Sequence, residues 1–288
     1  MSRIPDENDP NKNPILYHYC STEVLISIVQ KREIWLSDIN TMNDYSETHW
    51  AYDRFIDAAN LVLDKVGLDF VDLVDEIISA SQTRILPFIF CLSSNGDVLS
   101  QWRSYAADGT GVSLGFDAAL LQKLAVRSAQ IEYDRDTQND FFRAWLLAVH
   151  EVWSTIPETK REKFLFQSAA TMGVDLACFK NPAFSEEKEI RLIRAIEVEG
   201  SGLGLQLKDN GAAGRTRVAQ EKLPIHYRTR GGGIVMYVKV PLLKLGNELI
   251  KEVVLGPKSH NQGNEIISLL NQSGFRNFSI RRSEATYR

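Results

Sequence analysis

The charged segment from Phe184 to Leu192 (FSEEKEIRL) is the strongest candidate for chemistry in this chain. If the segment forms a strand, alternate side chains point to the same face, so Glu187, Glu189 and Arg191 lie together. Two carboxylates and a guanidinium in one cleft could raise one carboxyl pKa, orient a substrate hydroxyl or stabilise a developing cation. A solvated strand face whose charges pair weakly has the same pattern. Periodicity alone favours that plainer interpretation.

A histidine and two aromatic residues are further candidates. His18 lies within the strand-like run Leu16–Cys20, where a lone histidine is most often a satisfied residue of a core or cleft. An imidazole held by a strand can also offer a fixed donor to a ribose hydroxyl. Trp102 and Tyr105 are three residues apart, so they would share one side of a short helical turn. They could stack on a base or a nicotinamide ring, or pack under the following strand.

Other chemistries lack their sequence signals. The remaining histidines show no metal-ligand spacing, so no metal is predicted. The three cysteines are far apart and form no C-x-x-C pair, which is typical of buried small hydrophobic residues. No G-x-S-x-G motif marks a nucleophilic serine, and the glycine-rich stretches lack the Gly-Lys-Ser/Thr ending of a phosphate-binding loop.

Composition predicts an ordinary globular protein. The chain has 288 residues, of which 44% are hydrophobic and 24% charged, and its net charge is −4. This balance gives no electrostatic footprint for long nucleic acids, although a short basic groove from Lys31, Arg32, Arg103 and Arg228 stays open. No apolar run is long enough for a signal peptide or a membrane span, so we expect no membrane contact and a cytoplasmic location.

The elements that would position these residues follow from hydrophobic periodicity. We expect a strand over 15–20, then a helix capped by Ser21 or Thr22 that ends near Lys31. Asp44 and Glu47 make a capping box for the next helix. Further strands are predicted at 34–37, 88–92, 112–116, 131–133, 187–193, 224–227, 234–240, 249–255 and 278–281, and helices at 47–65, 69–83, 139–180 and 262–270.

Strands and helices do not alternate regularly, and no G-x-G-x-x-G follows the first strand. The order therefore favours an antiparallel-rich α+β fold over a doubly wound parallel sheet. We predict a disordered lead over residues 1–14 and one domain over 15–288, with helical insertions near 47–83 and 139–180. Residues 200–222 read as a mobile surface loop.

Short motifs along nearly the whole chain resemble a bacterial family catalogued as domain of unknown function 2971. They include the run 16–19 (LYHY), Trp35-Leu36-Ser37 followed by Met42-Asn43-Asp44, 90–93 (FCLS), 101–106 (QWRSYA), 111–116 (GVSLGF), 184–192, 254–257 (VLGP) and 283–288. Their order and spacing carry the resemblance more than any one motif does. Cys20 stands where threonine is more usual, which removes one hydroxyl near His18.

The layout also resembles, more distantly, ADP-ribosyltransferases of the His-Tyr-Glu type. That resemblance implies a split, antiparallel-rich β-sheet core and NAD as substrate. It implies that His18 holds the NAD ribose, that Glu189, or else Glu187, is the catalytic carboxylate, and that Trp102 and Tyr105 contact the nicotinamide. Ser37 would supply a hydroxyl on the second strand. Arg191 would contact the diphosphate or hold Glu189 in place.

The chemistry implied by the resemblance suits these residue types. Cleavage of the nicotinamide–ribose bond develops positive charge on the ribose, which a nearby carboxylate stabilises. The resemblance therefore predicts a mono-ADP-ribosyltransferase that acts on a protein or nucleic-acid acceptor. By analogy, the protein would be a toxin or phage-defence effector, and an inhibitor protein is a possible partner. Alternatives are an NAD glycohydrolase, an RNA-end-modifying enzyme, or a non-catalytic nucleotide-sensing or partner-binding module. Acceptor and oligomeric state stay open.

Overall fold

The computed structural model describes residues 7–41, 46–211 and 221–287. Its strands are β1 (Ile15–Cys20), β2 (Glu33–Asp38), β3 (Ile85–Ser93), β4 (Val112–Asp117), β5 (Arg127–Gln130), β6 (Glu189–Glu199), β7 (Gln206–Lys208), β8 (Ile225–Arg230), β9 (Gly233–Pro241), β10 (Ile250–Leu255) and β11 (Ser279–Arg282). Its α-helices are α1 (Thr22–Lys31), α2 (Ser46–Asn60), α3 (Leu63–Val66), α4 (Leu68–Arg84), α5 (Leu99–Tyr105), α6 (Ala118–Leu121), α7 (Arg135–Thr155), α8 (Glu158–Asp175) and α9 (Gly263–Gln272).

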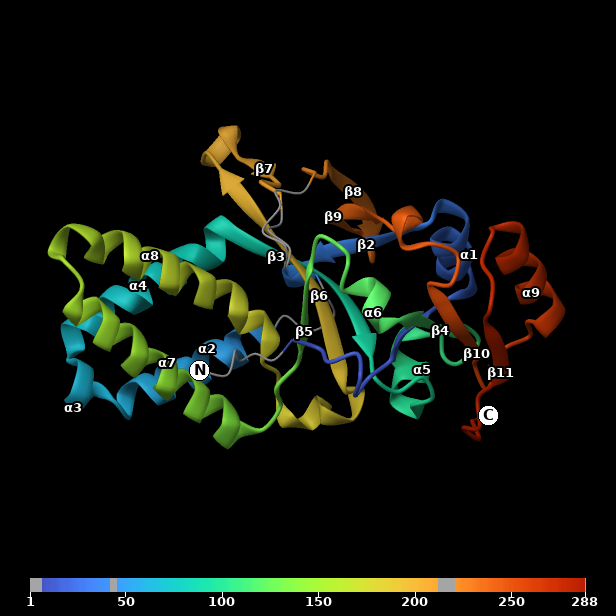
Figure 1. Cartoon of the computed structure of the whole chain (residues 1–288), viewed down its shortest axis with the longest axis horizontal. Coiled ribbons are helices and arrows are strands. Elements are labelled where there is room, and N and C mark those ends of the chain that lie inside the picture. Colours follow the sequence, from blue (N-terminus) through green and yellow to red (C-terminus); the bar gives the residue numbers. More distant parts are fainter. Residues whose placement is uncertain (1–6, 42–45, 212–220, 288) are drawn as a thin grey trace.

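These strands form one branched sheet (Figure 1). The main path runs β11-β10-β4-β1-β3-β2-β9-β8, and β6 pairs with β3 while β5 and β7 pair with β6. Among the described strands, β10 and β11 make a parallel pair and the other pairs are antiparallel. The predicted antiparallel-rich α+β class is therefore confirmed.

The sheet opens along one edge of β3. β6 pairs with β3 along its whole length, from Ile85 to Ser93, and so occupies the other edge. On the remaining edge, β2 pairs at Phe88 and Ile89 and β1 pairs at Ser93. β1 and β2 therefore diverge over residues 90–92 of β3. This divergence leaves an opening in the sheet between the first two strands of the chain.

Local sequence explains how β1 and β2 are connected. Ser21 caps α1 by accepting a hydrogen bond from the Val24 amide, and the apolar side of the helix packs inward. The helix ends at Arg32, which adopts a left-handed conformation (φ 49°, ψ 48°) and turns the chain back into β2. The predicted strand and helix over 15–31 match the observed bounds.

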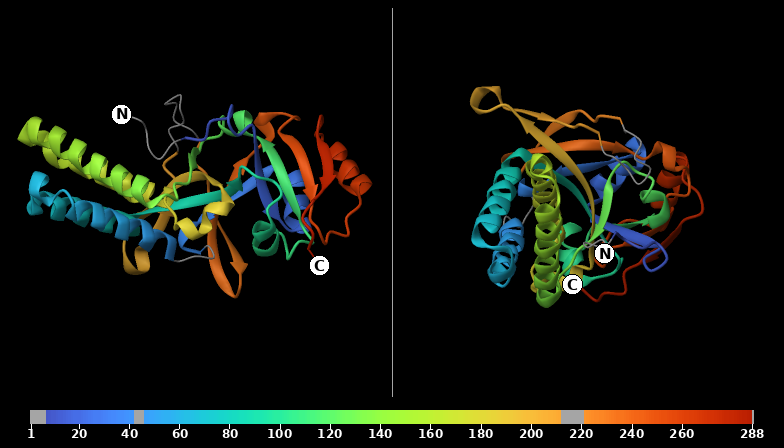
Figure 2. Two further views of the ribbon diagram at one scale, coloured as in Figure 1. Left: turned by 90° about the horizontal axis from the view of Figure 1, so that it is seen from below. Right: turned by 60° about the vertical axis from the view of Figure 1, so that its left-hand side comes forward.

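Two hydrophobic cores lie on opposite faces of the β3–β6 pair. Phe88, Phe90 and Leu92 belong to the first core, with α1, α6 and α9. Ile89 and Ile193 belong to the second, with the helical arm, which we define as α2, α3, α4, α7 and α8. Figure 2 shows the helical arm projecting away from the sheet in two layers. The predicted helical insertions thus form one structure, in which α4 packs on α8 and α2 on α7.

Three sequence expectations require correction. Residues 7–14 of the lead that we expected to be disordered contact the domain, because Glu7 bridges Ala129 and the Asn8 side chain is buried. The strand expected at 131–133 lies instead at β5. The loop expected at 200–222 contains a short 3-10 helix (Gly202–Gly204) and β7, and Asp209 is buried beside Arg194.

The capping box predicted from Asp44 and Glu47 is only partly covered by the described residues. Asp44, in the predicted capping box, lies outside them, as do residues 1–6 and 212–220. Within the described ranges, no helix combines the length and the hydrophobicity that a membrane span requires.

Candidate functional site

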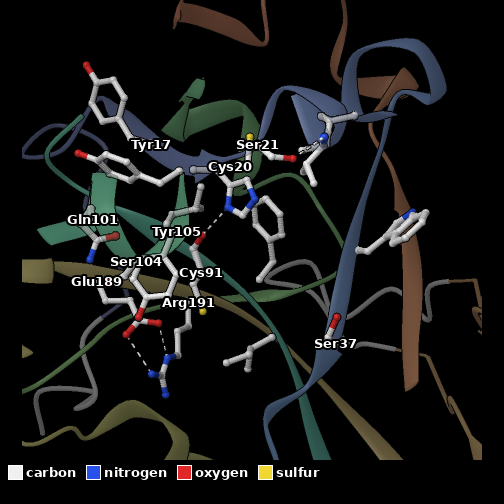
Figure 3. A pocket seen from close by; sticks show the side chains of 18 of the residues that line it. Tyr17, Cys20, Ser21, Ser37, Cys91, Gln101, Ser104, Tyr105, Glu189 and Arg191 are labelled. Atoms are coloured by element: carbon white, nitrogen blue, oxygen red, sulfur yellow. Dashed lines mark hydrogen bonds and ion pairs between the residues drawn. The ribbon is translucent and has the colours of Figure 1, made fainter. Parts of the chain in front are cut away.

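A cavity of about 870 Å³ lies at the opening between β1 and β2. Six of the seven site residues predicted from the sequence line it: His18, Ser37, Tyr105, Glu187, Glu189 and Arg191. They come from β1, β2, α5, the turn before β6, and β6 itself. Figure 3 shows Glu189 and Arg191 on one side of the pocket and Ser37 on the other. The seventh predicted residue, Trp102, is not among the lining residues.

His18 extends from β1 toward residues 90–92 of β3, which neither β1 nor β2 pairs with. Its Nδ1 lies 2.9 Å from the carbonyl oxygen of Cys91, and its ring stacks on Phe90 with centroids 4.1 Å apart. Because a carbonyl oxygen only accepts, the proton is on Nδ1 in the neutral ring. Burial lowers the pKa of His18 to about 4, although the bond to Cys91 acts in the opposite direction. His18 is therefore neutral near pH 7, and Nε2 is left as an acceptor.

The two glutamates do not share a strand face as the sequence suggested. Glu187 ends a 3-10 helix (Pro182–Glu187), which Asn181 caps, and Lys188 then adopts a left-handed conformation (φ 45°) before β6 begins at Glu189. The Asn-Pro start of this turn overrides the strand pattern over residues 187–193. The two carboxylates nevertheless lie close together, because both bind the same lysine.

Lys180 joins the two carboxylates. Its Nζ donates to Glu187 Oε2 at 2.6 Å and to Glu189 Oε2 at 3.2 Å. Its side chain is nearly buried, at 4% exposure. Sequence periodicity placed Lys180 at the end of a helix and gave no signal for this contact. The lysine was therefore missed, and its position beside the Asn-Pro turn is the feature that could have indicated it.

Arg191 holds Glu189 through a two-pronged contact. Arg191 Nε donates to Glu189 Oε1 at 2.7 Å and Nη2 to Oε2 at 2.9 Å, while Nη1 donates to the backbone oxygen of Ala177 at 2.7 Å. Both side chains are buried. Of the two roles considered for Arg191, this geometry favours positioning of Glu189 over contact with a diphosphate.

The glutamates differ in their electrostatic surroundings. Burial raises the pKa of Glu187, and the ammonium of Lys180 only partly offsets this effect. Burial acts in the same direction on Glu189, but the charges of Arg191 and Lys180 together outweigh it and hold the pKa well below its usual value. Glu189 is therefore a fixed anion, whereas Glu187 is the carboxyl that protonates more readily.

Tyr105 and Trp102 have different environments although they share α5. The Tyr105 side chain, with the residue 37% exposed, reaches into the pocket and donates from its hydroxyl to Glu187 Oε1 at 3.1 Å. Trp102 is fully buried, packs edge-on against Tyr19, and donates from Nε1 to Asp97 Oδ1 at 2.7 Å. The prediction that Trp102 contacts a nicotinamide is therefore wrong, because the ring belongs to a small core under the sheet.

The opposite side of the pocket is formed by β2 and β8. Ser37 Oγ accepts a hydrogen bond from Arg228 Nη2 at 3.0 Å, and Arg228 lies 5.4 Å from the ring centroid of Trp35. The sequence indicated Ser37 as a site residue and Arg228 only as part of a basic groove. The contact joins residues far apart in the chain, so periodicity could not predict it.

The described residues contain no group of three or more His, Cys, Asp or Glu side chains that could hold a metal ion. The pocket contains a neutral imidazole (His18), a phenol (Tyr105) and an arginine beside an aromatic ring (Arg228). It also contains two carboxylates that are paired with lysine and arginine side chains. These groups suit a polar organic ligand that carries hydroxyls and negative charge.

The comparisons with known proteins support part of the family resemblance. Residues 101–192 match the model of a family described as "Protein of unknown function (DUF2971)". This segment begins at α5 and ends within β6, so it contains Tyr105, Lys180, Glu187, Glu189 and Arg191. No curated protein and no solved structure gives a significant match to the chain. About a third of the chain, including one side of the pocket, is thus similar to a family whose description names no activity.

Proposed function

We propose that the pocket binds NAD, breaks its nicotinamide–ribose bond and transfers the ADP-ribose to an acceptor. One observation carries the proposal. His18 on β1 and Glu189 on β6 line the same pocket, at the opening between β1 and β2. The distant resemblance to His-Tyr-Glu ADP-ribosyltransferases implies a histidine on the first strand and a glutamate on a late strand in one site.

The two carboxylates suit different parts of this chemistry. Glu189 already accepts two hydrogen bonds from Arg191 and one from Lys180, and the Cys91 side chain also hydrogen-bonds to it. Its role would be a fixed negative charge that stabilises the oxocarbenium-like transition state without a proton transfer. Glu187 accepts two, from Tyr105 and Lys180, and its side chain is more accessible, at 11% against 6%. A carboxylate has about four acceptor positions, so Glu187 keeps capacity for a substrate hydroxyl.

His18 would hold the ribose. Its Nδ1 is committed to Cys91, so the unprotonated Nε2 is the atom that can accept a hydrogen bond from a ribose hydroxyl. The role expected from the sequence was that of a donor, and the geometry favours an acceptor instead. Fixing the sugar in this way would lower the entropic cost of attack by the acceptor.

A second candidate is a non-catalytic nucleotide-binding module, and one observation favours it. Lys180 and Arg191 balance the charges of Glu187 and Glu189, so the cluster as a whole is neutral. A neutral cluster stabilises a developing cation less than an isolated carboxylate does. In a sensor, the same cluster would instead rigidify one wall of the binding site.

Release of nicotinamide from NAD by the purified protein, in the presence of cell lysate, separates these functions. Transfer predicts release together with labelled macromolecules when the adenylate of NAD carries the label. Hydrolysis predicts release with free ADP-ribose as the labelled product. Nucleotide binding without release, by folded wild-type protein in several lysates, contradicts the enzymatic proposal and supports the sensor.

A further inference from the structure

Arg228 is a cation without a charged partner in the pocket wall. It lies on β8, is half-buried, and makes no ion pair with the residues that the structure describes. Nη2 donates to Ser37, but Nε is buried and has no hydrogen-bond partner among the described residues. A buried polar group without a partner costs free energy, and more so when it is charged. An anionic ligand in the pocket would supply the missing partner.

Aromatic rings fix the direction of this guanidinium. Its Cζ lies 5.4 Å from the centroid of Trp35 and 5.6 Å from that of Tyr237. The two rings stack with centroids 4.4 Å apart, and Trp35 Nε1 donates to Glu33 at 2.9 Å, which orients the indole. Cation–π contacts of this kind hold a guanidinium without neutralising it. Arg228 is therefore pre-oriented while its charge is uncompensated.

The surroundings of Arg228 favour an anion. Burial lowers the pKa of Arg228, and the like charge of Arg230 lowers it further, so both effects would be relieved by a negative ligand. Arg230 also lines the pocket. A guanidinium stays charged at neutral pH despite such shifts, and its planar fork matches phosphate oxygens. Two arginines at one end make a phosphate or diphosphate a better fit than a single carboxylate.

We propose that Arg228, with the Ser37 hydroxyl, binds a phosphate or diphosphate group at the β2–β8 end of the pocket. For NAD, this inference rests on the proposed function and places the diphosphate away from Arg191, which is committed to Glu189. Ser37 and Glu189 lie on opposite sides of the pocket (Figure 3). The ligand would thus extend from a phosphate-binding end to the His18 and Glu187 end, where its sugar lies.

The test is calorimetric titration of the full chain with ADP, and with adenosine as the ligand without phosphates. Arg228→Gln removes the charge, and Arg143→Gln is the matched control, because Arg143 is on the remote α7 and pairs with Asp140. We expect Arg228→Gln to weaken ADP binding at least tenfold and to leave adenosine binding unchanged, with no effect of Arg143→Gln. Arg228→Lys should recover part of the loss, because it keeps the charge without the fork.

Thermal melting guards against a purely structural role. Removal of an uncompensated, half-buried charge should leave the Tm of Arg228→Gln unchanged or raise it. A lower Tm, equal ADP affinity in Arg228→Gln and wild type, or no ADP binding by folded wild type would overturn the inference. The release of nicotinamide from NAD tests the proposed function separately from the phosphate site. If ADP binding depends on Arg228 but nicotinamide is not released, the proposed function is wrong and the phosphate site stands. If nicotinamide is released but Arg228→Gln leaves the KM for NAD unchanged, the proposed function stands and the phosphate site is wrong.

Discussion

His18 donates its Nδ1 proton to the backbone oxygen of Cys91, at 2.9 Å. This oxygen belongs to the stretch of β3 that neither β1 nor β2 pairs with, between Ile89 and Ser93. The imidazole therefore satisfies a backbone acceptor at the point where the sheet opens. A strand partner would close the pocket here, whereas a side chain keeps it open.

Acid should weaken the fold through His18. Its pKa is about 4 in the folded protein and near 6.5 when the chain is unfolded, so the unfolded state takes up a proton first. The stabilisation is complete above pH 6.5 and is lost as the pH falls from 6.5 to 4. We expect wild type to lose up to about 3 kcal/mol more than His18→Gln over this range, measured by urea unfolding. Parallel curves for the two proteins would contradict the neutral histidine.

Arg194 and Asp209 form a buried ion pair that should matter far more than an exposed pair nearby. Both side chains are 1% exposed, and Arg194 Nη2 lies 2.6 Å from Asp209 Oδ2. Arg194→Ala leaves a buried carboxylate without its partner, so we expect a loss of about 3–5 kcal/mol in the free energy of unfolding.

The control is Lys208→Ala, which removes an exposed pair with Glu199 on the adjoining β6–β7 strands. Exposed pairs contribute about 0–1 kcal/mol. Chemical denaturation of both variants measures the difference. Similar losses in the two variants would mean that the Arg194 pair is not desolvated in solution.

Asp97 ties the C-terminal segment to α5. Its carboxylate accepts from Trp102 Nε1 at 2.7 Å, from the Glu284 amide at 2.8 Å and from the Ser283 hydroxyl. Asp97→Ala leaves the buried Trp102 donor without a partner, so we expect a loss of about 1–3 kcal/mol. Limited proteolysis should also remove the residues after Arg282 faster. Asp57→Ala, which removes an exposed pair on α2, should change neither quantity much.

Much of the local structure could be predicted, because local signals decide it. The aromatic and branched run of β1, the Ser21 cap and the periodic α1 lie within one short stretch of chain. The Asn-Pro turn at Asn181 is also a local signal, but the alternation of charges after Phe184 predicts a strand that already includes Glu187. Glu187 was therefore assigned to β6, although the left-handed Lys188 separates it from the strand.

The pocket itself could be predicted only in part. Periodicity predicts which face of a strand a side chain occupies, but not which strand lies beside it. The pairing of β1 and β2 with one edge of β3 could therefore not be predicted. The role of Lys180 and the unpaired charge of Arg228 depend on this pairing. Trp102 shows the opposite limit: both it and Tyr105 lie on the short helix α5, but the burial of Trp102 depends on Tyr19 and Asp97 from other elements.

The central claim is that the carboxylates in the pocket carry NAD chemistry, and the chain offers a matched control for it. Glu186 is exposed and adjacent to Glu187, so Glu186→Gln makes the same chemical change outside the pocket. Each Gln variant should be shown to be folded by its melting curve, because Glu189 is buried against Arg191.

Initial rates of nicotinamide release from NAD by wild type, Glu186→Gln, Glu187→Gln and Glu189→Gln are the most direct test. The account predicts release by wild type and Glu186→Gln, and a loss of at least a hundredfold in folded Glu187→Gln and Glu189→Gln. Unchanged rates in both pocket variants, or no release by folded wild type, would contradict it.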